Sequence, residues 1–176
     1  MATGVAAVVV TAPVGEASAN PRRDGFSYGA NLLGGAFDAD GDVGPAAGFA
    51  GRIGLVVAEK FGLFGELTVS ESWHDTGKQE HAGICLAASA WIEGRVSISV
   101  GVGAAVADGE DRGDQMSSFV ADGTAVTASL GYDLKHWRRS ALVVRGHLIM
   151  NDGDDGKGVL YGLALGIDGF ELGASR

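Results

Sequence analysis

Residues 95–108 have the sequence R-V-S-I-S-V-G-V-G-A-A-V-A-D. The even-numbered positions, from Val96 to Val106, are aliphatic, whereas the odd-numbered positions hold Arg, Ser, Gly or Ala. This period of two predicts a β-strand, because successive side chains of a strand point to opposite faces of the sheet. Branched aliphatic residues on one face and small residues on the other are typical of a small closed barrel with a crowded interior and lipid outside.

The composition fits one barrel domain. The chain has 176 residues, with 30 glycines and only 3 prolines, which suits tight turns and a narrow interior better than a helical bundle. A formal net charge of -9 argues against nucleic acid as a partner, since nucleic-acid binding needs a basic face. The single cysteine, Cys85, excludes an internal disulfide and predicts a buried thiol within a strand.

The same alternation recurs along the chain, and no apolar run reaches the ~20 residues that a membrane-spanning helix needs. With residues 95–108, the alternating segments are about 25–37, 46–58, 61–73, 81–92, 118–133, 140–150 and 158–167. The sequence therefore predicts an all-β fold, an eight-stranded antiparallel up-and-down β-barrel of the transmembrane type, over residues 25–172. Residues 173–176 form a C-terminal tail in this interpretation.

Residues 1–24 differ from the rest of the chain. They contain the apolar stretch V-A-A-V-V-V-T-A-P-V, and Ala17-Ser18-Ala19 has the small-x-small form of a signal-peptidase site. No Lys or Arg precedes Arg22. The segment is interpreted as signal-peptide-like, with a disordered tail or an extra strand as alternatives.

Two further regularities accompany the eight strands. The predicted connections after the first, third, fifth and seventh strands are long and polar, and the others are shorter, as in outer-membrane barrels with long external loops and short periplasmic turns. Aromatic residues lie near predicted strand ends, where amphipathic rings favour the membrane interface. We expect five of them to be interfacial: Phe61, Trp73, Trp91, Tyr132 and Trp137.

With these features the chain resembles the small eight-stranded outer-membrane β-barrel proteins of Gram-negative bacteria. The resemblance also rests on glycine-rich phrases such as G-F-S-Y-G at 25–29, S-V-G-V-G at 99–103 and Y-G-L-A-L-G at 161–166. It implies a bacterial outer-membrane location, a monomer in contact with the lipid bilayer, and a non-enzymatic role in envelope structure, surface interaction or porin-like permeation.

Charged side chains fall on the inward-facing positions of several predicted strands. These are Arg52, Glu66, Arg95, Arg145 and His147. The lumen of an eight-stranded barrel is filled by side chains, and an unpaired charge there is costly. We therefore expect a charge-paired interior network, with a narrow polar path or a small-ligand pocket as the alternative.

Acidic residues gather in the predicted long loops. They include Asp38, Asp40, Asp42, Asp108, Asp111, Asp152, Asp154 and Asp155. Their main interpretation is solvated turn residues; a calcium site, or divalent cations that bridge to lipopolysaccharide phosphates, is the alternative. The spacing of Asp38, Asp40 and Asp42 imitates the start of a helix-loop-helix calcium loop, but Phe49 stands where the twelfth-position Glu belongs.

Two other function classes stay open. Ser72, His74 and Asp75, with His81 across the same hairpin, raise the hypothesis of a lipid A-modifying enzyme, although nothing in the sequence places a nucleophile next to a base and no catalytic residue is assigned. A soluble barrel that binds a hydrophobic ligand would need the aliphatic face inside and the Gly-rich face in water. Such an exterior would be poorly soluble, so the sequence favours lipid outside.

Overall fold

The computed structural model describes residues 25–39, 41–58, 60–74, 77–92, 94–111, 121–137, 139–153 and 156–170. The interpretations of residues 1–24 and 173–176 lie outside the described residues. Within the described ranges, no helix has the length and apolar composition needed to cross a bilayer.

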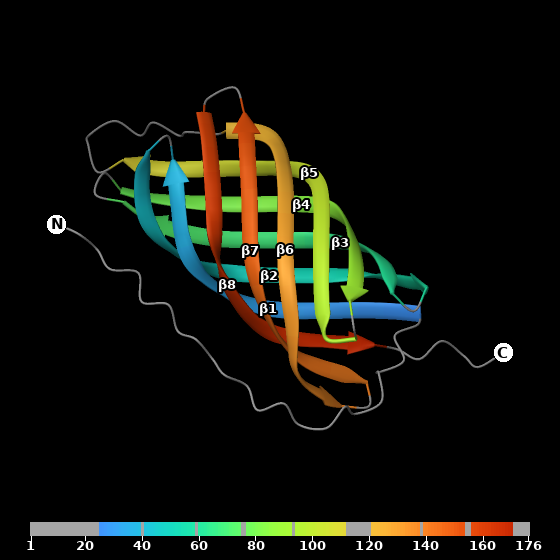
Figure 1. The fold of residues 1–176 in the computed structure, drawn as a ribbon. Helices are drawn as coiled ribbons and strands as arrows, with labels where there is room; N and C mark the ends of the chain where they lie inside the picture. Colours follow the sequence, from blue (N-terminus) through green and yellow to red (C-terminus); the bar gives the residue numbers. More distant parts are fainter. Residues whose placement is uncertain are drawn as a thin grey trace.

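Eight antiparallel strands form a closed barrel in sequence order, and Figure 1 shows them coiling around a common axis. Their bounds are β1 Gly25–Ala39, β2 Asp42–Ala58, β3 Phe61–Trp73, β4 Gly77–Ile92, β5 Val96–Asp111, β6 Ala121–Trp137, β7 Ser140–Gly153 and β8 Gly156–Phe170. β1 pairs with both β2 and β8, so the sheet has no free edge. The predicted eight-stranded all-β barrel is confirmed.

The period-two pattern sorts side chains between the outside and the lumen as predicted. In β5, Val100 and Val102 are 57% and 58% exposed, whereas Ser97 and Ser99 are both 3% exposed. Large exposed aliphatic side chains occur on all eight strands; we call this surface the aliphatic belt. A soluble barrel with a hydrophobic pocket needs the opposite orientation, so the structure argues against that alternative.

The strands extend further than the turn-forming residues suggested. We call the end of the barrel that carries the connections after β1, β3, β5 and β7 the loop rim, and the opposite end the turn rim. The predicted long loops at 38–45, 74–80 and 151–158 are wrong: β2 already begins at Asp42, β4 at Gly77 and β8 at Gly156. Ladder hydrogen bonds between neighbouring strands override the local preference of Asp and Gly for turns.

The connection between β1 and β2 illustrates how a tight turn replaces the expected loop. Gly41 has a φ of 95°, a conformation that is strained for residues with a side chain. Its N–H donates to Oδ1 of Asp38 at 2.8 Å, which fixes the reversal of the chain.

Buried apolar clusters and polar side chains fill the lumen. Towards the loop rim, Phe37 packs with aliphatic residues that include Leu33, Ile149 and Leu160. Towards the turn rim, Phe64 packs with Val56 and Trp91. The thiol of Cys85 is buried against Ala105 and Ala125, as predicted.

We predict that adding a methyl group to a glycine has opposite effects on stability on the two faces of the barrel sheet. A Cβ on the lumen-facing Gly103 would lie 1.9 Å from the Ile84 carbonyl oxygen, whereas a Cβ on the outward-facing Gly146 would meet nothing within 4 Å. We expect Gly103→Ala to lower the free energy of unfolding by about 1–3 kcal/mol, because the backbone of β4 must move. Gly146→Ala should raise it by about 0.5–1 kcal/mol, since alanine loses less conformational entropy in a strand.

Urea unfolding of the detergent-folded variants, followed by tryptophan fluorescence, measures both effects. Equal shifts for Gly103→Ala and Gly146→Ala would contradict the assignment of the two faces.

Candidate functional site

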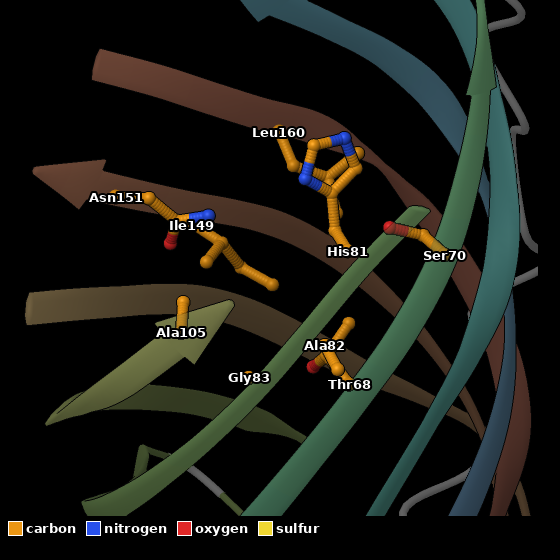
Figure 2. A pocket seen from close by; sticks show the side chains of 9 residues that line it. All are labelled: Thr68, Ser70, His81, Ala82, Gly83, Ala105, Ile149, Asn151 and Leu160. Atoms are coloured by element: carbon orange, nitrogen blue, oxygen red, sulfur yellow. The ribbon is translucent and has the colours of Figure 1, made fainter. Parts of the chain in front are cut away.

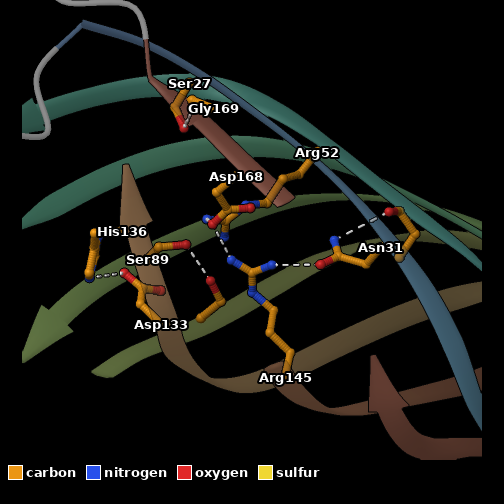
Figure 3. A network of polar contacts seen from close by, with 11 residues as sticks. Ser27, Asn31, Arg52, Ser89, Asp133, His136, Arg145, Asp168 and Gly169 are labelled. Carbon is orange, nitrogen blue, oxygen red and sulfur yellow. Dashed lines mark hydrogen bonds and ion pairs between the residues drawn. The ribbon is translucent and has the colours of Figure 1, made fainter. Parts of the chain in front are cut away.

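Two arginines and one aspartate form a buried ion-pair network in the middle of the lumen. Nη2 of Arg52 in β2 donates to Oδ2 of Asp168 in β8 at 2.6 Å, and Nη2 of Arg145 in β7 donates to the same oxygen. Each of the three residues is at most 5% exposed. We call this group the Asp168 bridge; Figure 3 shows the two guanidinium groups meeting at the carboxylate.

Neighbouring residues hold the two guanidinium groups in place. Nη1 of Arg145 donates to Oδ1 of Asn31 at 2.8 Å, and Nδ2 of Asn31 donates to the Ala50 carbonyl at 3.3 Å. The guanidinium carbon of Arg52 lies 4.4 Å from the centroid of the Phe64 ring, which is a cation–π contact. The network thereby joins four strands, β1, β2, β7 and β8, across the lumen.

Glycine makes room for the bridge. Gly29 of β1 lies opposite Arg52 of β2 on one side and opposite Asp168 of β8 on the other. A Cβ at Gly29 would come within 2.4 Å of Oδ1 of Asp168. The ion pair therefore crosses β1 at an inward position that has no side chain to obstruct it.

The predicted interior charges divide into three groups. Arg52 and Arg145 belong to the bridge, and His147 is buried nearby in the lumen. Glu66 lies opposite Arg52 in the strand register, yet Arg52 pairs with Asp168 instead. Arg95 lies half-buried in the turn that precedes β5, which begins at Val96, and its inward placement stays a prediction.

The sequence interpretation missed Asp168 and Asn31. Both could have been found from the two-residue period: one further step beyond Gly166 on the inward face of the last strand reaches Asp168. Asn31 likewise lies on the inward face of the first strand, between the outward Ala30 and Leu32.

Two cavities lie in the lumen along β3 and share Thr68 as a wall. The middle cavity, next to the Asp168 bridge, is lined by Asn31, Ala50, Gly51, Arg52, Glu66, Thr68, Arg145 and His147. The upper cavity lies nearer the loop rim (Figure 2) and is lined by Thr68, Ser70, His81, Ala82, Gly83, Ala105, Ile149, Asn151 and Leu160. Oγ of Ser70, Nδ1 of His81 and Oδ1 of Asn151 are buried there without a hydrogen-bond partner, so ordered water or another polar ligand is expected in the upper cavity.

Four of the five predicted interfacial aromatics are on the outside of the barrel. Phe61, Trp73, Tyr132 and Trp137 are 37–58% exposed. The prediction for Trp91 is wrong, because this side chain is 3% exposed and points into the lumen. Its ring meets Phe64 edge-on, with the centroids 6.1 Å apart, and fills the lumen near the turn rim.

The predicted acidic ligands whose side chains are described each have a different neighbour in the structure. Asp38 accepts the Gly41 N–H, Asp42 lies 3.6 Å from Nδ1 of His74, and Asp152 lies 3.3 Å from Nζ of Lys157. Asp40, Asp154 and Asp155 lie outside the described residues, and Asp108 and Asp111 are placed only by their position in β5. Among the side chains that the structure describes, no three His, Cys, Asp or Glu residues group around a common metal position.

The hydroxyl and imidazole groups named in the enzyme hypothesis do come together. Oγ of Ser72 lies 3.0 Å from Nε2 of His74 and 3.4 Å from Nε2 of His81. Ser72 is fully buried on the lumen side of β3, so the hydroxyl has no contact with the outer surface where a lipid substrate would lie. Asp75 lies outside the described residues.

Solved structures with the same fold are known, although no protein-family model and no curated protein matches the chain. Ail, the attachment invasion locus protein of Yersinia pestis, is 17% identical, with 82% of this chain and 99% of Ail covered and a TM-score of 0.63. Neisserial surface protein A is 10% identical, with 83% and 97% covered and a TM-score of 0.65. The N-terminal β-barrel domain of Pseudomonas aeruginosa OprF is 16% identical, with 81% and 96% covered and a TM-score of 0.56.

Proposed function

Because the chain shares its fold with small outer-membrane β-barrels, we propose that it is a non-enzymatic integral protein of the bacterial outer membrane that spans the bilayer as a monomer. The aliphatic belt is the observation that carries this proposal. Leu32, Leu86 and Leu163, from three different strands, are 66–72% exposed, which is unfavourable in water and favourable in a lipid bilayer. Strands of 13–17 residues are long enough to cross a bilayer at a tilt.

The interior supports a closed lumen rather than a pore. The Asp168 bridge crosses the middle of the barrel, and Phe37 and Phe64 fill the lumen on either side of it. Eight strands enclose an interior just wide enough for side chains. We therefore place the role of the protein in envelope structure or surface interaction at the loop rim, and we expect no ion conductance in planar bilayers.

The acidic residues of the loop rim bear on the kind of surface partner. Ail was solved in complex with the heparin analogue sucrose octasulfate. The present chain has a formal net charge of -9 and carries Asp38, Asp42 and Asp152 at the loop rim, so we expect it to repel sulfated glycans. Divalent-cation bridges to lipopolysaccharide stay a prediction of the sequence.

Heat-modifiable gel mobility tests the membrane proposal. The chain is refolded in detergent micelles and in plain buffer, and each sample is run with and without boiling. We expect a compact, boiling-sensitive, strand-rich species in detergent only, because the aliphatic belt needs an apolar solvent. Val100→Pro removes a ladder N–H in the middle of β5 and serves as a control that should not fold.

A monomeric, strand-rich protein in plain buffer would contradict the proposal. Stepwise ion conductance of the detergent-folded protein in planar bilayers would contradict the closed lumen but leave the membrane location intact.

A further inference from the structure

The connection between β6 and β7 carries more positive charge than the two other connections of the turn rim. Residues 134–139 read L-K-H-W-R-R, and no acidic residue occurs in 134–151. The connections after β2 and β4 contain E-K at 59–60 and E-G-R at 93–95, so a glutamate in each offsets the basic residue. Among the three connections, the excess of positive charge therefore lies at one hairpin.

A β-bulge turns a basic and an aromatic side chain of this hairpin outward. Up to Tyr132, the even-numbered residues of β6 face the outside of the barrel. The register with β7 then shifts between Asp133 and Lys135, which leaves Leu134 as the extra residue. Beyond the shift, the odd-numbered Lys135 and Trp137 are the exposed residues. Unbroken alternation would direct both side chains into the lumen, so the bulge accounts for their position on the outer surface.

The nearest acidic residue along β6 lies on the lumen side. The side chain of Asp133 is 3% exposed, and its Oδ2 is 3.3 Å from Nε2 of His136, whose side chain is 9% exposed (Figure 3). Among the side chains that the structure describes, no carboxylate forms an ion pair with Lys135 or Arg139. Both cations are therefore available to an anion from outside the described part of the chain.

The two cations lie at the edge of the aliphatic belt. Nζ of Lys135 is 5.5 Å from the centroid of the Trp137 ring, which is a cation–π contact. Arg139 is exposed in the turn, and its carbonyl oxygen accepts the N–H of Phe170 at 2.8 Å, which continues the ladder between β7 and β8 by one step. The exposed Leu134 extends the belt up to Lys135. Tryptophan and lysine side chains beside apolar surface are typical of the depth at which lipid head groups lie.

We propose that Lys135, Trp137 and Arg139 form a binding site for the phosphate head group of an anionic phospholipid in the leaflet at the turn rim. The ammonium and guanidinium groups donate charge-assisted hydrogen bonds to phosphate oxygens, and the acyl chains lie along the aliphatic belt below Leu134. A zwitterionic head group carries its own cation, which competes with those of the protein. The inference rests on the membrane location proposed above and adds the class of lipid that the turn rim selects.

The charge of the whole chain makes this selection local. The formal net charge is -9, so the protein as a whole repels anionic lipid. The described loop rim carries acidic residues such as Asp38, Asp42 and Asp152. Enrichment of anionic lipid is therefore expected at the β6–β7 hairpin and not at the loop rim.

Quenching of tryptophan fluorescence by brominated lipids measures which lipid lies next to each rim. Trp137 at the turn rim is 45% exposed and Trp73 at the loop rim is 40% exposed, so variants that retain only one of them report on opposite ends of the barrel. Both variants also carry Trp91→Phe, which removes the fluorophore in the lumen. In vesicles of phosphatidylcholine and phosphatidylglycerol, one lipid or the other is brominated. We expect phosphatidylglycerol to be enriched beside Trp137 and not beside Trp73.

Substitutions at the hairpin test the two cations. We expect Lys135→Gln and Arg139→Gln each to lower the relative affinity for phosphatidylglycerol about fivefold, the effect of one cation near an anionic surface. Salt at about 1 M should weaken the preference as well, because it screens exposed charges. Lys60→Gln is the matched control. Its carbonyl oxygen accepts the Trp91 N–H as that of Arg139 accepts the Phe170 N–H, but Glu59 precedes it, so the preference at Trp137 should stay unchanged.

The outcomes separate the lipid site from the membrane location. Equal quenching of Trp137 by the two brominated lipids, or a preference that survives Lys135→Gln/Arg139→Gln, would overturn the lipid site and leave the membrane location intact. An equal preference for phosphatidylglycerol at Trp73 and Trp137 would also overturn it. If neither lipid quenched either tryptophan, both the membrane location and the lipid site would be contradicted.

A measurement with all three tryptophans in place covers the case in which Trp91→Phe does not fold, which heat-modifiable mobility reveals. Native mass spectrometry of the protein from micelles that contain both lipids counts the lipid molecules retained. The wild-type protein should retain phosphatidylglycerol in preference to phosphatidylcholine, and Lys135→Gln/Arg139→Gln should not. The same lipid retention by both proteins would overturn the proposal.

Discussion

Replacing Asp168 by asparagine is expected to lower the free energy of unfolding by about 3–5 kcal/mol, the cost of removing one partner from a buried ion pair. The carboxylate is the shared acceptor of Arg52 and Arg145, and all three residues are almost fully buried. Without its charge, two buried guanidinium groups are left close together without a carboxylate between them. Urea unfolding of the detergent-folded protein, followed by tryptophan fluorescence, measures the loss.

The matched control for Asp168→Asn is Asp152→Asn. Asp152 pairs with Lys157, but both side chains are more than 65% exposed, so the change should cost less than about 1 kcal/mol. If Asp168→Asn cost no more than Asp152→Asn, Glu66, which lines the adjoining cavity, would be compensating the two arginines. The Asp168 bridge would then not be the element that holds the lumen together.

Leu163→Arg should destabilise the protein in a bilayer by about 2–4 kcal/mol, the cost of an arginine that faces lipid at the membrane midplane. Leu163 is 66% exposed and lies at the middle of β8. The effect depends on lipid outside the barrel, because the same substitution on a water-exposed surface is close to neutral. Unfolding of the protein in lipid vesicles, rather than in detergent, is the informative measurement.

Val57→Arg is the control for depth in the membrane. Val57 is also aliphatic and 65% exposed, but it lies one residue from the end of β2 at the turn rim. An arginine near the interface costs only about 0–1 kcal/mol. Equal effects of Leu163→Arg and Val57→Arg would mean that the belt does not span a lipid layer.

Strand identity was predictable from the sequence because it depends on a local property. The two-residue period fixes which face a side chain occupies, so the outward valines and inward serines of β5 follow from residues 95–108 alone. The ends of the strands were less predictable. Asp and Gly at 38–45 have turn preferences, but the ladder between β1 and β2 continues to the pair Ala39 and Asp42.

For Trp91, the two-residue alternation of β4 was a better guide than the general preference of tryptophan for membrane interfaces. Its position on the inward face, in step with Ser89, was readable from the alternation, yet the preference of tryptophan for membrane interfaces favoured the outside. The space beside Phe64 accommodates the indole in the lumen. The available volume inside the barrel decided the outcome, and this volume depends on side chains from several strands.

The sequence by itself determined the all-β architecture, the number of strands and the inward face of Arg52, Glu66, Arg145 and His147, since all three follow from short-range periodicity. Only the tertiary structure decided the pairing of these charges. Glu66 is opposite Arg52 on the adjacent strand, but Arg52 binds Asp168, which is 116 residues away in sequence. Closure of β8 onto β1 brings that carboxylate across Gly29, and closure is a property of the whole barrel that no single segment encodes.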